Sequence, residues 1–168
     1  MSARKNAVKG SEAVPAPEMT TDDMYVRGRE HVERMDHKEA MKWFRLAAER
    51  GHAEAHFHIG MMYEKGAGVA KNDEKALSGF RSAAEHGHAE AQFLLGASYF
   101  YGKGVQTNRA DAVRWLYLGA EQGHANSQFL LGFILLSGSG APKSEQEAYN
   151  WLRLAANQGH AEAKKFFR

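Results

Sequence analysis

The sequence contains no cysteine, only three prolines and no long apolar run. The lack of cysteine excludes disulfides, thiolate nucleophiles and cysteine-ligated metal sites. No apolar stretch is long enough to span a membrane, and none follows the basic residues near the start of the chain in the manner of a signal peptide. We therefore expect no membrane span, and a cytoplasmic protein, or a periplasmic one if a leader has been removed.

The chain also lacks a large excess of charge of either sign. The chain has 22 basic and 20 acidic side chains, which are interspersed and give a net charge of +2. Such a balance offers no electrostatic attraction to nucleic acid or to an anionic membrane. The 168 residues, 43% of them hydrophobic, suffice for one domain with a buried interior.

The first twenty residues differ from the rest of the chain. They are polar, lack hydrophobic periodicity and contain Pro15 and Pro17. These features predict a disordered N-terminal arm over residues 1–20 and a folded domain over residues 21–168. Thr20, Thr21 and Asp22 offer N-cap oxygens for a first helix.

A Gly-His pair returns through the folded part at a spacing of 36 residues. Its glycines are Gly51, Gly87, Gly123 and Gly159. A repeat of this length indicates stacked supersecondary units, each of which buries its apolar face against its neighbours.

Each unit contains the signals of two helices. Residues suited to N-caps precede the second helix at one phase of the repeat: Asp36, Asn72, Asn108 and Ser144. The repeated glycine suits the left-handed position that ends this helix, and the histidine after it opens the next one. Ala55, Ile59 and Tyr63 share one face of the first helix.

The interior glycines of the first helices, Gly60, Gly96 and Gly132, predict close approach of a neighbouring helix, which we expect at alanine pairs such as Ala83-Ala84. The sequence thus predicts an all-α solenoid of helix-turn-helix units. It has three full repeats (52–87, 88–123 and 124–159), a shortened N-terminal one and a C-terminal capping helix over 160–168.

The pattern resembles the Sel-one-like repeat family, 36-residue relatives of tetratricopeptide repeats. The third unit carries the family motif in these residues: Ala91, Leu95-Gly96, Tyr99, Gly102, Gly104-Val105, Ala112, Trp115, Ala120 and Gly123-His124. The resemblance implies a right-handed α-solenoid, a bacterial style of repeat, and a role as scaffold or adaptor. Gly79 departs from the tryptophan at Trp43, Trp115 and Trp151, so we expect weaker packing between the second and third units.

Nine histidines raise the hypothesis of a metal site. His52 and His56 have the i, i+4 spacing of a helical metal pair, with His58 nearby, and these three define an alternative reading as a small metal-dependent enzyme. No His-Glu-x-x-His motif occurs, however, and a capping role explains His52 together with His88, His124 and His160.

Signals of catalysis are weak. The serines lie at helical repeat positions, and the Gly-x-Gly loops follow no strand and precede no P-loop lysine. We therefore expect no enzymatic activity, no cofactor and no bound metal.

A second face of the first helices predicts a partner-binding site. By analogy with tetratricopeptide stacks we expect it to line a concave groove that binds a peptide, loop or helix of another protein. Its candidate residues are Phe57, Met61, Glu64, Phe93, Ala97, Phe100, Tyr101, Phe133 and Leu136. For Phe57, Phe93 and Phe129 the alternative is packing between adjacent first helices.

The apolar run 129–136 leaves a further alternative open. It is either covered by the closing helix, with Phe166 and Phe167 as lids, or offered to a partner. We expect a monomer, and self-association through this helix would instead give a weak, concentration-dependent homodimer.

Overall fold

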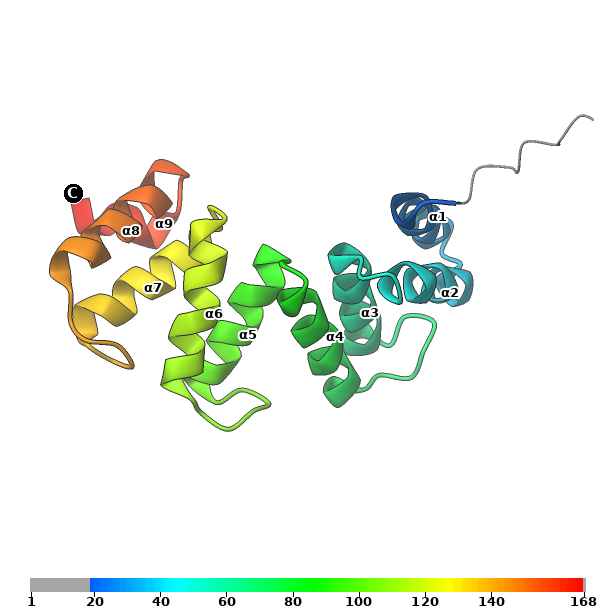
Figure 1. Cartoon of the computed structure of the whole chain (residues 1–168), viewed down its shortest axis with the longest axis horizontal. Helices are drawn as coiled ribbons and strands as arrows, with labels where there is room; N and C mark the ends of the chain where they lie inside the picture. The colour runs from blue at the N-terminus through cyan, green and yellow to red at the C-terminus, as the bar shows by residue number, and fades with distance from the viewer. Residues whose placement is uncertain (1–18, 168) are drawn as a thin grey trace, which may run out of the picture.

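The computed structural model describes residues 19–167, and these form a row of paired helices with no strand among them (Figure 1). The predicted arm 1–20 lies outside the described residues apart from Met19 and Thr20. The helices are α1 (Thr21–Glu33), α2 (His37–Ala48), α3 (Ala53–Lys65), α4 (Asp73–Glu85), α5 (Ala89–Tyr101), α6 (Arg109–Glu121), α7 (Ala125–Ser137), α8 (Glu145–Asn157), α9 (Ala161–Lys164) and the 3-10 turn η1 (Lys165–Phe167).

Each odd-numbered helix from α1 to α7 packs against the even-numbered helix that follows it, and each pair packs on the next. Figure 1 shows the pairs following one another along the molecule, with α1 at one end and α9 at the other. The predicted α-solenoid is therefore confirmed. No helix of residues 19–167 is long and apolar enough to cross a membrane.

The helices begin where the sequence predicts. The Nδ1 atoms of His52, His88, His124 and His160 each accept a backbone N–H three residues on, so all four histidines are N-caps. Asp36, Asn72 and Asn108 cap the second helices in the same way, whereas Ser144 makes no side-chain cap bond. Thr20 and Asp23 form a capping box on α1, which places Thr20 in the folded domain.

The repeated glycine ends the second helices by a Schellman motif. Gly87 follows the last turn of α4 with φ +90°, a conformation that costs glycine nothing. Its N–H donates to the carbonyl of Ala84, and the N–H of His88 donates to that of Ala83. One Gly-His pair therefore closes one helix and caps the next.

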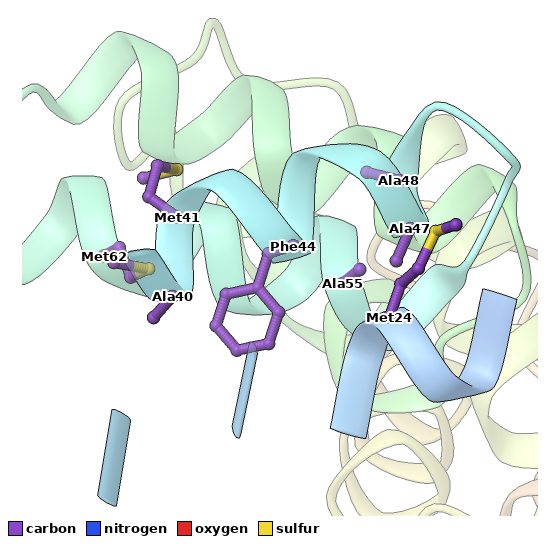
Figure 2. Close-up of a cluster of buried hydrophobic side chains, with 8 residues drawn as sticks. All are labelled: Met24, Ala40, Met41, Phe44, Ala47, Ala48, Ala55 and Met62. Atoms are coloured by element: carbon purple, nitrogen blue, oxygen red, sulfur yellow. The ribbon is translucent and has the colours of Figure 1, made fainter. Parts of the chain in front are cut away.

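Three clusters of buried side chains follow one another along the solenoid. The first joins α1, α2 and α3 through side chains that Figure 2 labels, with Phe44 among methionines and alanines. The second, smaller cluster joins α4 and α5 through Ala83, Ala84, Ala91 and Leu95. The third joins α6, α7 and α8 and contains Leu116, Leu131 and Ile134.

The interior glycines do mark close helix contact, but not at the alanine pairs. A Cβ on Gly96 would lie 2.8 Å from Cγ of Leu116 and 3.2 Å from the carbonyl oxygen of Ala112. Gly60 meets Phe80, and Gly132 meets Leu152, in the same way. The expectation of contact with Ala83-Ala84 is wrong because the large residue one turn earlier fills this space.

Candidate functional site

The histidines of the predicted metal group are engaged in three separate contacts. Nε2 of His52 lies 3.4 Å from a carboxylate oxygen of Asp22, while the ring of His56 stacks on His86 at 4.9 Å. The ring of His58 stacks on Phe44 at 4.9 Å. Residues 19–167 contain no cluster of three potential metal ligands. The metal-dependent reading therefore has no support in the described residues.

The capping histidines also link neighbouring repeats. Since Nδ1 of His88 accepts the amide of Ala91, its Nε2 carries the proton and donates to Glu54 of the preceding repeat, 3.1 Å away. Nε2 of His124 makes the same bond to Glu90 at 2.8 Å. Each histidine thus binds its own helix on one side and the previous first helix on the other.

Three predicted aromatic positions pack against this histidine series. Phe57 stacks on His88 at 4.2 Å, Phe93 lies 5.3 Å from His124 and Phe129 stacks on His160 at 4.4 Å. All three phenylalanines are half-buried. Their place is between successive first helices, where they stabilise the stack.

Ser127, His124 and Glu90 form a hydrogen-bonded series that resembles a catalytic triad. The hydroxyl of Ser127 lies 3.0 Å from Nδ1 of His124, whose Nε2 contacts Glu90. Ser127 is fully buried, however, and Nδ1 already accepts its backbone N–H at 3.3 Å. A substrate carbonyl has no approach to this hydroxyl, so the series serves as a helix cap.

The other predicted site residues divide by exposure. Tyr101 and Phe133 expose 67% and 45% of their surface, and Glu64 is exposed as well. Met61 is half-buried, and so are three residues that pack against the third cluster: Ala97, Phe100 and Leu136. Tyr101 and Phe133 are therefore the aromatic side chains of the predicted set that a partner can reach.

A groove of about 860 Å³ opens between the α3/α4 pair and α5. Three of the predicted residues, Glu64, Ala97 and Tyr101, lie along it. The prediction missed three apolar side chains that also line the groove, which are Leu77, Phe80 and Leu94. Leu77 and Phe80 belong to the second helix α4, whereas the predicted face consists of residues from first helices.

The groove lies at the junction where the sequence predicted weak packing, but Gly79 does not line it. A Cβ on Gly79 would lie 2.8 Å from Cα of Gly60, within the same repeat. This glycine lets α4 approach α3 closely. Ser98 lines the groove instead, so Gly79 does not explain the opening between the second and third units.

The expected lids do not cover α7. Phe167 lies 6.2 Å from the ring of Tyr149 and beneath the guanidinium of Arg153, both on α8. Phe166 and Phe167 stay substantially exposed. The run 129–136 is mostly buried by the helices α6 and α8, and Phe133 is its exposed member.

Known proteins share this architecture. A Sel1 repeat protein from Oxalobacter formigenes superposes with a TM-score of 0.86 at 29% identity, over 89% of this chain and 44% of that one. The protective antigen c5321 of uropathogenic Escherichia coli gives 0.75 at 31% identity, over 86% of this chain and 32% of that one. The chain therefore spans less than half of either protein.

A curated relative shows a shorter match. The DAP3-binding cell death enhancer 1 of Rattus norvegicus is 47% identical over 38 residues, which are 23% of this chain and 8% of that protein. The model of the Sel1 repeat matches four consecutive segments of the chain, residues 23–52, 53–88, 89–124 and 125–160. The chain belongs to the Sel1 repeat family.

Proposed function

We propose that this chain is a non-catalytic scaffold that binds a segment of another protein on the face formed by α3, α5 and α7. The observation that carries the proposal is the exposure of Tyr101 and Phe133 on neighbouring first helices, with the 860 Å³ groove beside Tyr101. Membership of a family whose members mediate protein–protein interactions supports it.

The chemistry of this face suits a protein segment. Tyrosine and phenylalanine offer large rigid contact areas at a low cost in conformational entropy, and such side chains dominate binding energies at interfaces. Charged side chains at the edge, such as Glu64 and Lys103, would set the register of the bound segment. A peptide, loop or helix would each satisfy these contacts.

The proposal is tested by affinity capture from a lysate of the source organism. The bait is the wild-type chain beside a Tyr101→Ser/Phe133→Ser variant. Phe100 is left intact because it packs against the third cluster. A Tyr149→Ser/Leu154→Ser variant is the matched control, since these side chains on α8 are 40% and 46% exposed.

The expected result is a protein retained by the wild type and by the α8 control but lost by the Tyr101/Phe133 variant. Equal retention by all three baits would refute the placement of the site. A protein lost only by the α8 variant would move the site to the second helices.

A further inference from the structure

Of the three junctions between successive helix pairs, the two outer ones (α2–α3 and α6–α7) are built alike, and the middle one (α4–α5) differs. Two residues after the interior glycines of α3, α5 and α7 stand Met62, Ser98 and Ile134. Met62 and Ile134 are 5% and 0% exposed and belong to the first and third clusters. Ser98 is half-exposed and lines the groove. A serine therefore occupies a position that is filled by a large apolar side chain at the other junctions.

The facing wall of the middle junction shows the same change. The first helix on this side of each junction also has an interior glycine: Gly28 against Phe44, Gly60 against Phe80 and Gly96 against Leu116. The residues four positions after these glycines are Val32, Glu64 and Phe100. Val32 packs against the first cluster and Phe100 against the third. Glu64 is exposed on the groove. Both walls of this junction thus carry a polar residue where the other junctions pack an apolar one against their cluster.

The loops close the outer junctions and leave the middle one open. A Cβ on Gly68 would lie 2.7 Å from His37 at the start of α2, and one on Gly140 would lie 2.7 Å from Arg109 at the start of α6. No atom of residues 19–167 lies within 4 Å of such a Cβ on Gly104. The loop between α5 and α6 therefore stands away from α4, and the groove reaches solvent beside it.

The charges along the groove are unequally satisfied. Lys71 pairs with Asp73 at 3.6 Å, and Arg81 donates to the hydroxyl of Tyr99 at 3.3 Å. Glu64 and Glu74 have no ion pair within residues 19–167, and neither have Arg81 and Lys103, the other two cations of the lining. The exposed carboxylate of Glu64 is thus free of an ion pair in the described residues and can pair with a cation of a partner.

We propose that the middle junction is a docking slot for one aliphatic side chain of a partner segment, with a lysine or arginine beside it that pairs with Glu64. The outer junctions indicate the chemistry of the occupant, because methionine and isoleucine fill the corresponding space there. The apolar lining residues Leu77, Phe80 and Leu94 receive the aliphatic group. The inference rests on the proposed function and specifies the chemistry of its partner.

The test is a selection of random twelve-residue displayed peptides on the wild-type chain. Retained peptides are synthesised, and their affinities are measured by fluorescence anisotropy. We expect them to share a leucine, isoleucine or methionine with a lysine or arginine within one helical turn.

Variants of the two walls then locate the bound peptide. Ser98→Ile and Ser98→Met place the chain's own aliphatic group in the slot, so both should weaken binding by about ten- to a hundred-fold. Glu64→Gln should weaken it by about two- to five-fold and reduce its salt dependence. Glu121→Gln, an exposed carboxylate on α6, is the matched control and should bind as the wild type does.

The fold of the Ser98 variants is checked by their thermal unfolding, which should shift upward by about 2–6 °C. Peptides without the aliphatic-basic pattern, or with equal affinity for wild type and both Ser98 variants, would overturn the slot. Peptides that tolerate the Ser98 variants but not Tyr101→Ser/Phe133→Ser would overturn it while leaving the proposed function intact. A selection that retains no peptide on the wild type contradicts both the slot and the proposed segment binding.

Discussion

Buried glutamines join the repeats at the scale of single residues. The side-chain amide of Gln128 donates to the carbonyl of Ala120 at 3.2 Å, and its oxygen accepts from Gln158 at 2.8 Å. Gln92 makes the corresponding bonds to Ala84 and Gln122 one repeat earlier. Neither was predicted, because a single polar residue within a helical pattern gives by itself no sign of being buried. Their recurrence at 36 residues was the available signal.

Gln128→Ala should lower the free energy of unfolding by about 1–3 kcal/mol, since it leaves buried hydrogen-bonding groups without their partner. Gln146→Ala is the control, because Gln146 is exposed and its side chain bonds, among the described residues, only to Asn150 on its own helix. Urea denaturation followed by circular dichroism measures both. Equal effects of the two substitutions would show that the bonds of Gln128 contribute nothing.

Gly79→Trp provides a second test at this scale. The repeat pattern favours tryptophan here, but a Cβ at this site would lie 2.8 Å from the backbone of Gly60. We expect the substitution to destabilise the chain by about 1–3 kcal/mol or more, because α4 must move away from α3. Thermal unfolding checks this, and a gain in stability would contradict the contact.

At the scale of the element, α3 carries two histidines held away from water. Burial lowers the pKa of His58, whose ring lies on Phe44 and whose Nε2 is 3.2 Å from the hydroxyl of Tyr25. Burial also lowers the pKa of His56, with the nearby His86 as a smaller cause. The fold therefore prefers both rings neutral.

This preference makes stability depend on pH. The unfolded chain binds protons to His58 more readily than the fold does, so stability falls as the pH drops below the unfolded value of about 6.5 and levels off only below the lower folded pKa. The melting temperature of the His58→Phe variant should fall less between pH 7.5 and pH 5 than that of the wild type. An unchanged loss would show that His58 is not responsible.

The helix ends were the most predictable elements. Capping residues and the Gly-His pair act within a few residues of the chain, so Asp36, His88 and Gly87 could be interpreted from sequence alone. The helix that Gly79 faces and the exposure of Phe100 could not be predicted, since both depend on how neighbouring helices approach one another. Partner binding at the candidate face stays a prediction.

At the scale of the whole molecule, the middle junction is where we expect the solenoid to divide into two cooperative blocks. The cluster that joins α4 to α5 consists of three alanines and one leucine, whereas the outer clusters bury phenylalanine, methionine and larger aliphatic groups. The stability of a repeat array is approximately a sum of repeat terms and interface terms. From these buried side chains we expect this interface to contribute less to stability than the outer ones do.

Native-state hydrogen exchange should accordingly resolve two cooperative blocks, α1–α4 and α5–α8, with different opening free energies. Ser98→Ile should strengthen their coupling by about 1–3 kcal/mol through burial of its side chain. The two sets of amides should then exchange with more similar free energies. A single free energy for all helices in the wild type would contradict the division.

Amide chemical shifts measured on titration with the captured partner test most directly whether the partner binds at the face of α3, α5 and α7. The largest shifts should fall at Glu64, Leu94, Ser98, Tyr101 and Phe133, and the amides of α6 and α8 should stay largely unchanged. Shifts concentrated on Tyr117, Tyr149 and Leu154 of the second helices would contradict binding at this face.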